Sequence, residues 1–321
     1  LPIAIQARND GFKGFILPLQ NAKEAGIVND LVVYGMQNLA EVIGFFKGTE
    51  KPNPVVVNTR EEFMKQINSY EQDFSDVKGQ ENIKRALEIA AAGGHNVILI
   101  GPPGAGKTML AKRLPTILPP LNLHEALEST KIYSVVGKIP TTSALLTERP
   151  FRAPHHTISD VALVGGGMNP QPGEISLAHN GVLYLDELPE FKREVLEVMR
   201  QPLEDREVTI ARAKFTITYP SSFMLVASMN PSPSGFFNDS KNSNGASQME
   251  MQRYLSKISG PLLDRIDIHI EVTPVPFEKL SETRKAESSV EIRKRVTEAR
   301  NIQTKRFENY NHIHYNAQMS S

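Results

Sequence analysis

The chain has 321 residues, of which 40% are hydrophobic and 22% are charged, and it contains no cysteine. This composition is typical of a globular protein with room for two domains, and it excludes disulfide bridges and thiolate metal sites. Its 36 basic and 36 acidic residues balance, so any contact with nucleic acid must come from a local feature of the surface. No apolar run reaches the roughly 20 residues of a membrane-spanning helix, and we expect no membrane partner.

Residues 1–47 have the pattern of a small α/β piece. Strands are expected at Phe15–Pro18 and Leu31–Tyr34, and a short helix is expected at Leu39–Phe46. A piece of this size is short for a core of its own, and the chain starts with leucine rather than methionine, so we expect it to belong to a longer protein. Residues 48–73 contain Gly, Pro and Asn and are predicted to be a linker.

Residues 74–275 alternate strand and helix patterns, which predicts an α/β domain with a parallel sheet between helices. A helix is expected at Glu81–Ala92, ended by two glycines. The strands are apolar runs of the kind that parallel sheets bury on both faces, and they are expected at Val97–Ile100, Val182–Leu185, Phe223–Ala227 and Ile268–Val272.

Two further elements follow different patterns. The alternating segments Val208–Ile210 and Phe215–Thr218 flank a short basic turn and predict a β-hairpin. Residues 276–321 are predicted to be a charged helical segment with a helix from Ser288 to Asn309. Such a charged helix is typical of a solvated surface laced by ion pairs, and contact with DNA is the less favoured alternative.

A glycine-rich segment, Gly-Pro-Pro-Gly-Ala-Gly-Lys-Thr at residues 101–108, lies between the first sheet strand and a helical pattern. In this context the spacing G-x-x-x-x-G-K-T predicts a phosphate-binding loop, in which backbone N–H groups surround the phosphates of ATP. Lys107 is expected to reach the β- and γ-phosphates, and the Thr108 hydroxyl is expected to ligate Mg²⁺. A glycine-rich turn that matches by chance is the alternative. The expected nucleotide-binding residues are Gly101, Pro102, Pro103, Gly104, Ala105, Gly106, Lys107, Thr108 and Met109.

Two later strand ends carry polar residues suited to ATP hydrolysis. Asp186 and Glu187 directly follow an apolar run, so Asp186 is expected to hold Mg²⁺ through water and Glu187 to polarise the attacking water. Asn230 follows the next apolar run and is expected to hold the lytic water or the γ-phosphate. A simple Asn-Pro turn is the alternative for Asn230.

The segment Pro261–Asp267, which contains Arg265, comes just before the last predicted strand. An arginine that does not reach the nucleotide of its own chain can stabilise transition-state charge on ATP held by a neighbouring subunit. Local pairing with Asp264 or Asp267 is an equally open alternative at this point.

The order of these elements resembles that of the AAA+ ATPases. Three intervening segments are similar to the magnesium-chelatase-like ComM/YifB family: Pro-Phe-Arg-Ala-Pro-His-His-Thr-Ile-Ser at 150–159, Pro-Gly-Glu-Ile-Ser-Leu-Ala-His at 172–179 and Ser-Gly-Pro-Leu-Leu-Asp-Arg at 259–265. The resemblance covers most of residues 1–320. It implies a Lon-protease-like domain, of which residues 1–47 are the last part, followed by an AAA+ domain with a helix-2 insert and a pre-sensor hairpin.

The resemblance also implies roles for single residues. It makes Arg265 the finger that acts across a subunit interface and Asn230 the sensor-1 residue. It places residues 161–173 in the helix-2 insert and residues 206–219 in the pre-sensor hairpin, both facing the pore of a ring that is expected to be a hexamer.

Arg212 then falls where the related MCM helicases carry a pore lysine. Arg212 and Lys214 are therefore candidates for contacts with DNA phosphates. Two solvated charges at a hairpin turn are the alternative, and the sequence does not favour either.

Three departures from the family pattern change what is expected. Many members carry four cysteines after sensor 1, whereas this chain has Ser232, Ser234, Asn244 and Ala246 at the matching positions, so we expect no zinc. No Ser–Lys dyad can be assigned, so no protease activity is expected. The helical lid with its sensor-2 arginine is expected beyond Ser321.

The leading hypothesis is a cytoplasmic ATP-hydrolysing motor that acts on single-stranded or branched DNA. Relatives of ComM act as hexameric helicases that drive branch migration during natural transformation, and the resemblance implies the same activity here. The alternatives are a motor subunit that drives metal insertion by a chelatase, a remodelling ATPase without a DNA substrate, and a scaffold that does not hydrolyse ATP.

Overall fold

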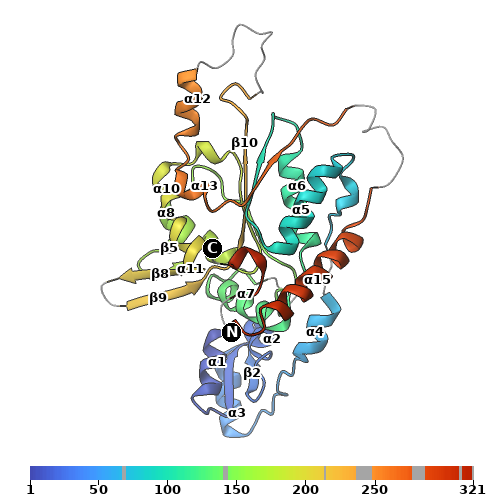
Figure 1. Ribbon diagram of the computed structural model, residues 1–321. Coiled ribbons are helices and arrows are strands. Elements are labelled where there is room, and N and C mark those ends of the chain that lie inside the picture. The colour runs from blue at the N-terminus through green and yellow to red at the C-terminus, as the bar shows by residue number, and fades with distance from the viewer. Residues whose placement is uncertain are drawn as a thin grey trace. The chain divides into compact units, whose positions relative to one another are not determined.

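The computed structural model describes residues 1–66, 70–139, 144–212, 215–235, 248–276, 286–310 and 313–319. The chain divides into two compact units. One unit consists of Leu1–Ser69 and Leu121–Glu148, and the other consists of Tyr70–Pro120 and Arg149–Ser321. Figure 1 labels the helices and strands of both units.

The first unit contains a two-stranded parallel sheet, in which β1 and β2 pair with α2 as the crossover between them. Its elements are α1 (Pro2–Asn9), β1 (Gly14–Pro18), α2 (Leu19–Ala25), β2 (Val32–Met36), α3 (Leu39–Lys47), α4 (Thr59–Gln66) and α7 (Leu123–Val135). The two predicted strands and the predicted helix of this part are confirmed to within two residues. The sequence did not predict α1, α4 or α7, and α4 lies inside the segment that was expected to be a linker.

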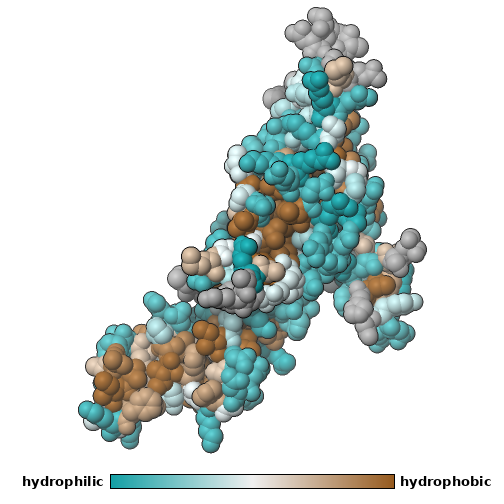
Figure 2. Space-filling model, turned by 90° about the vertical axis from the view of Figure 1, so that its left-hand side faces the viewer, coloured by the Kyte–Doolittle hydropathy of each residue, from teal (hydrophilic) through white to brown (hydrophobic). Residues whose placement is uncertain are grey.

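The α3 helix of this unit has an apolar face that the described residues do not cover. Its start is capped by the Asn38 side chain, and it ends at Gly48, whose φ is 74°. Leu39, Ile43 and Phe46 share one face by their spacing and are 73%, 46% and 76% exposed. Figure 2 shows brown, hydrophobic surface at the bottom left of the view.

The second unit is built on a five-stranded sheet with the order β11-β3-β10-β7-β4, and every neighbouring pair is parallel. Its strands are β3 (Val97–Ile100), β4 (Phe151–Arg152), β5 (Gly165–Gly166), β6 (Gln171–Pro172), β7 (Val182–Leu185), β8 (Glu207–Arg212), β9 (Phe215–Pro220), β10 (Met224–Met229) and β11 (Ile268–Glu271). Its helices are η1 (Phe74–Asp76), α5 (Glu81–Gly93), α6 (Lys107–Ile117), α8 (Asp160–Val164), α9 (Glu174–Leu177), η2 (Leu188–Glu190), α10 (Arg193–Glu197), α11 (Arg200–Asp205), α12 (Gln248–Leu255), α13 (Gly260–Leu263), α15 (Ser289–Arg306) and η3 (Asn316–Gln318).

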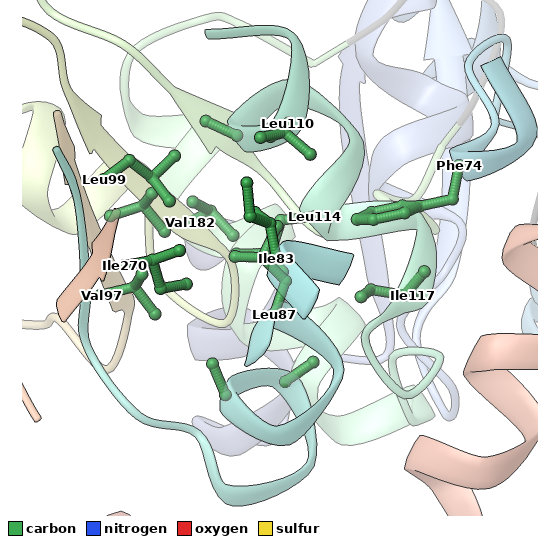
Figure 3. Close-up of a cluster of buried hydrophobic side chains, with 14 of the residues drawn as sticks. Phe74, Ile83, Leu87, Val97, Leu99, Leu110, Leu114, Ile117, Val182 and Ile270 are labelled. Carbon is green, nitrogen blue, oxygen red and sulfur yellow. The ribbon is translucent and has the colours of Figure 1, made fainter. Parts of the chain in front are cut away.

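Helices cover both faces of this sheet. Val97 and Leu99 of β3 pack in one hydrophobic cluster with residues of α5, α6 and α15, whereas Ile98 between them packs in a second cluster with residues of α9, α10 and α13. This alternation follows from the strand geometry, which points successive side chains to opposite faces. Figure 3 shows the first cluster, in which side chains of α5 and α6 lie over the strands.

The predicted parallel α/β sheet is therefore confirmed. The strands expected at 97–100, 182–185, 223–227 and 268–272 are β3, β7, β10 and β11, and the predicted hairpin is β8–β9. The sequence did not predict β4, the edge strand of the sheet, because its two residues are too few to make an apolar run.

An ion-pair network joins α5 to α15. Arg295 donates to the carboxylate of Glu88 from Nε at 2.6 Å, and Arg85 approaches the same carboxylate at 3.1 Å. Burial raises the pKa of Glu88, but the hydrogen bonds and charges of the two arginines lower it further, so its pKa lies below the ordinary value of 4.5.

We expect Glu88→Gln to lower the melting temperature at pH 7, because it removes the charge that both arginines face. The folded-state pKa of Glu88 is depressed, so its contribution is present above the ordinary value of 4.5 and is lost as pH falls through the lower folded value. Thermal unfolding of wild type and variant should therefore converge in acid. Glu298→Gln, an exposed substitution on α15, is the control, and a difference that persists unchanged in acid contradicts the assignment.

Candidate active site

The loop between β3 and α6 has the backbone of an anion-binding loop. Gly104 and Gly106 have φ of 77° and 91°, the left-handed region that favours glycine. At Gly101 an added Cβ would lie 2.2 Å from the Val272 carbonyl oxygen, so a larger residue cannot be accommodated without moving the chain. The α6 helix starts directly after the loop, with Met109 in its first turn, so its amino-terminal N–H groups face the loop.

The Lys107 ammonium lies inside this loop. Its Nζ donates hydrogen bonds to the carbonyl oxygens of Gly101 at 2.5 Å and Pro102 at 3.0 Å, and to Asn230 Oδ1 at 3.1 Å. Burial lowers the pKa of Lys107, and the two carboxylates at the end of β7 partly offset that effect. Neutral oxygens thus hold the cation at the carboxyl edge of the sheet, where a phosphate oxygen can replace them as partner.

Thr108 and Asp186 meet at the same edge. Thr108 Oγ1 donates a hydrogen bond to Asp186 Oδ2 at 3.1 Å. The other carboxylate oxygen accepts hydrogen bonds from the Ser228 hydroxyl and from the Glu187 backbone N–H. The buried Tyr184 hydroxyl lies 3.1 Å from Ser228 Oγ and 3.3 Å from Thr108 Oγ1. Burial raises the pKa of Asp186, but these hydrogen bonds outweigh burial and keep it below its ordinary value, so the carboxylate is ionised at neutral pH.

The oxygen atoms of Thr108 and Asp186 fit Mg²⁺. This ion prefers hard oxygen ligands, keeps several waters, and is usually bound by one or two protein groups together with phosphates. Among the residues that the structure describes, no group of three or more His, Asp or Glu side chains could hold a metal by itself. The donor set therefore suits an ion bound jointly with a phosphate.

A cleft of about 570 Å³ opens beside these groups. Glu187 lines it with a side chain that is 56% exposed, and its Oε2 lies 3.9 Å from Nδ1 of His156. Glu187 also has a φ of 54°, a left-handed conformation that is uncommon for a residue with a side chain. The carboxylate can therefore accept a hydrogen bond from a water molecule in the cleft.

Asn230 is held from two sides. Its side chain accepts the hydrogen bond from Lys107, and its backbone carbonyl accepts one from the Tyr254 hydroxyl at 3.1 Å. Tyr254 lies on α12, and burial raises its pKa to about 12. The hydroxyl stays protonated at neutral pH and positions the residue that follows β10.

We expect Tyr254→Phe to lower kcat for ATP hydrolysis about 2- to 10-fold, because a neutral hydrogen bond contributes about 0.5–1.5 kcal/mol. The KM for ATP should change less, since Lys107 still contacts Asn230. Steady-state kinetics test this, with the exposed Tyr310→Phe as control. An unchanged kcat contradicts a positioning role for Tyr254.

Arg265 lies at the amino-terminal ends of the sheet strands, opposite the carboxyl ends where Lys107 and Asp186 lie. Asn96, which directly precedes β3, donates from Nδ2 to the Arg265 carbonyl oxygen at 2.8 Å, whereas Lys107 and Asp186 lie where β3 and β7 end. Because parallel strands all run from one edge to the other, the length of a strand separates Arg265 from the P-loop of its own chain.

The local partner of Arg265 differs from the one that the sequence suggested. Its Nη2 pairs with the carboxylate of Glu204, and its Nη1 donates to the Pro261 carbonyl oxygen at 2.7 Å. Asp267, one of the two expected partners, instead pairs with His95 at 3.0 Å. The Glu204 carboxylate on α11 is thus closer to the Arg265 guanidinium than the carboxylates of the aspartates that neighbour Arg265 in sequence.

Two hairpins lie side by side in the second unit, and the longer one projects from the sheet (Figure 1). Arg212 is exposed at the end of β8, and Lys214 lies outside the described residues. The β5–β6 turn contains Gly165, Gly166 and Gly167, all with positive φ, and a Cβ at Gly166 would lie 3.0 Å from Arg212 Nη2. The arginine therefore lies over a glycine-rich turn.

Residues 73–280 match the protein family described as magnesium chelatase, subunit ChlI, which is of the AAA+ type. The match covers more than half of the chain, and the five-stranded parallel sheet agrees with it. This chain belongs to the magnesium chelatase ChlI family.

Two relatives are similar over most of the chain, and a third is similar over about half of it. Competence protein ComM of Haemophilus influenzae is 45% identical over 304 residues, which are 94% of this chain and 59% of the relative. The protein YifB of Escherichia coli is 44% identical over 313 residues, which are 95% and 60%. The magnesium-chelatase 38 kDa subunit of Rhodobacter capsulatus is 28% identical over 177 residues, which are 49% and 50%.

The resemblance to ComM and YifB is therefore confirmed, and this chain spans about three fifths of the length of those two relatives. The hydroxyls of Ser232 and Ser234 lie 2.8 Å apart, and Asn244 and Ala246 lie outside the described residues, so the absence of zinc stays a prediction. Within the described ranges, no helix combines the length and the apolar character needed to cross a membrane.

Three residues of the site were missed from the sequence. Tyr184 precedes Asp186 by two positions, and Ser228 precedes Asn230 by two, so each shares a strand face with a residue that was predicted. This period of two could have indicated both hydroxyls. Tyr254 comes from a separate helix, and no local pattern connects it with Asn230.

Proposed function

We propose that this chain is the motor part of an Mg²⁺-dependent ATPase that works as a ring and moves DNA. The observation that carries the proposal is the meeting of Lys107, Thr108, Asp186 and Asn230 at one edge of the sheet, joined by hydrogen bonds of 3.1 Å. Cation, hydroxyl and carboxylate in this arrangement, beside an anion-binding loop, fit a triphosphate and its metal ion.

Each group has a role in this proposal. Lys107 moves its hydrogen bonds from the loop carbonyls to the β- and γ-phosphates. Thr108 and Asp186 hold Mg²⁺, which when bound supplies positive charge against the phosphates. Glu187 accepts a proton from the attacking water as the water oxygen bonds to the γ-phosphorus, while the bond from that phosphorus to the oxygen that leaves with ADP breaks. Asn230 orients the water or the γ-phosphate.

Assembly into a ring, proposed to be a hexamer, completes the site. Arg265 lies at the edge of the sheet away from its own Lys107, so its proposed action is on ATP held by the next subunit. The same arrangement makes the isolated chain a poor ATPase, because no neighbour supplies the guanidinium.

DNA is the proposed substrate of the motor. The exposed Arg212 at the end of a projecting hairpin, next to a glycine-rich turn, suits contact with a phosphate backbone. The similarity to competence protein ComM supports a helicase or translocase that promotes branch migration during transformation or recombination.

Branch-migration assays on the full-length protein test this function. With ATP and Mg²⁺, the wild type should convert a four-way DNA junction to its branch-migration products. Glu187→Gln should do so only at the background rate. ATP turnover should rise when single-stranded or branched DNA is added, and Arg212→Ala should weaken that rise. Equal branch migration by wild type and Glu187→Gln would show that the motor does not act on DNA in this way.

A second candidate is a motor subunit that drives insertion of a metal ion into a porphyrin. The family match and the similarity to the magnesium-chelatase 38 kDa subunit favour it. It predicts ATP turnover that porphyrin-binding partner subunits stimulate and that DNA leaves unchanged. Turnover measured with each addition separates the two candidates.

A further inference from the structure

The junction between α11 and the long hairpin is a stiff connection. The α11 helix ends at Asp205, Arg206 has a left-handed φ of 58°, and β8 starts at the next residue. The Ser221 N–H donates to the Arg206 carbonyl oxygen at 2.7 Å, which closes the base of the hairpin. With one residue between helix and paired strand, a displacement of the hairpin also displaces α11.

This junction is anchored on one side. The Tyr315 ring contacts the guanidinium groups of both Arg206 and Arg300, whose Cζ atoms are 5.4 Å and 4.4 Å from the ring centre. Arg300 in turn donates to the carbonyl oxygens of Ala91 and Ala92 at the end of α5. Arg206 is thus held, through Tyr315 and Arg300, against the end of α5. Along the chain, Glu204 precedes Arg206 and the hairpin follows it.

Glu204, which precedes this junction on α11, forms an ion pair with the guanidinium of Arg265. Nη2 of Arg265 faces the Glu204 carboxylate, Nη1 faces the Pro261 carbonyl, and its Nε is buried with no hydrogen-bond partner in the described part of the chain. A guanidinium paired with a carboxylate has little net charge to offer a phosphate. Because the side chains of Arg265 and Glu204 are 30% and 49% exposed, solvent can compete for the pair and it can open.

We propose that Glu204 is a positioning residue that restrains Arg265 until the hairpin is engaged. Displacement of the hairpin pivots α11 about the anchored Arg206, withdraws the carboxylate, and leaves Arg265 free to reach the phosphates held by the next subunit. The inference rests on the proposed function, specifically on Arg265 acting across the interface, and it adds the residue that makes this action depend on the substrate.

The experiment compares ATP turnover of the full-length wild type and Glu204→Gln, each with and without single-stranded DNA. We expect Glu204→Gln to raise turnover without DNA at least about threefold and to reduce the stimulation by DNA towards onefold, because amide nitrogen and oxygen do not neutralise the guanidinium. Glu204→Asp keeps the charge and should remain nearer to the wild type. Asp205→Asn, an exposed neighbour on α11, is the matched control and should leave both rates unchanged.

A double variant tests whether Glu204 works through Arg265. Turnover of Glu204→Gln/Arg265→Ala should equal that of Arg265→Ala alone, since without the guanidinium there is nothing to restrain. A purely structural role of Glu204 would instead lower the melting temperature and reduce turnover in both backgrounds.

Two results would overturn the inference, provided that Arg265→Ala is inactive. In the first, Glu204→Gln has the turnover and the DNA stimulation of the wild type. In the second, Glu204→Gln lowers turnover with and without DNA by the same factor. The second would make the carboxylate part of the productive finger. If Arg265→Ala itself retains wild-type turnover, the finger role fails, and with it this part of the proposed function. The single and double variants therefore tell the two failures apart.

Discussion

Lys107→Ala is expected to reduce ATP turnover by at least about 100-fold, because it removes a preorganised cation from the position where phosphate charge develops. The ammonium has three oxygen partners in the structure, and all of them lie at the carboxyl edge of the sheet. The variant should also bind ATP more weakly. Phosphate release under saturating Mg²⁺ and titration with a fluorescent ATP analogue measure the two effects.

The control for this prediction is Lys112→Ala, which removes an exposed lysine from the same helix. It should leave turnover and binding unchanged, and both variants should melt close to the wild type. Turnover within about threefold of the wild type in Lys107→Ala would remove the basis for a phosphate-binding role of this loop.

Arg265→Ala should have the largest effect of all, a loss of about 10³-fold in turnover, which is the lower end of what an arginine finger contributes. Unlike Lys107→Ala, it should leave ATP binding to the individual chain almost unchanged, because Arg265 lies at the far edge of the sheet from the P-loop. Turnover and nucleotide affinity, measured on the same preparation, separate these two expectations.

Mixing the two inactive variants tests whether the finger acts between subunits. An interface is complete again when an Arg265→Ala subunit supplies Lys107 and its Lys107→Ala neighbour supplies Arg265. Random one-to-one mixing produces this at about one half times one half, or a quarter, of the interfaces. Turnover should therefore recover to a sizeable fraction of the wild type. Complete inactivity of the mixture, in rings of normal size, would mean that Lys107 and Arg265 of the same subunit act together.

The residues that the sequence predicted at the carboxyl edge are the ones that short, local sequence patterns locate. The P-loop spacing, the apolar strand before Asp186 and the strand before Asn230 each specify where a side chain emerges. Because parallel strands end at a common edge, these three separate patterns together predict one site from the sequence alone.

The partners of the predicted site residues were less predictable. Glu204 pairs with Arg265 and Tyr254 supports Asn230, and each of these contacts joins elements whose relation depends on packing rather than on a repeat in the sequence. The edge strand β4 was missed for the same reason, since its place beside β7 is set by pairing and not by its own two residues.

The strand β11 connects the surroundings of Arg265 to the nucleotide loop. This strand starts at Ile268, beside Asn96 at the Arg265 edge, and Val272 after it accepts the close approach of Gly101, with its own N–H bonded to Ile100 at 2.7 Å. One short extended segment thus touches the nucleotide loop at one end and begins three residues after Arg265 at the other. A shift of this loop on phosphate binding would act on the carboxyl end of β11, whose other end lies close to Arg265. In the proposed ring, this one strand would link the nucleotide of each subunit to the arginine that the same subunit presents to its neighbour.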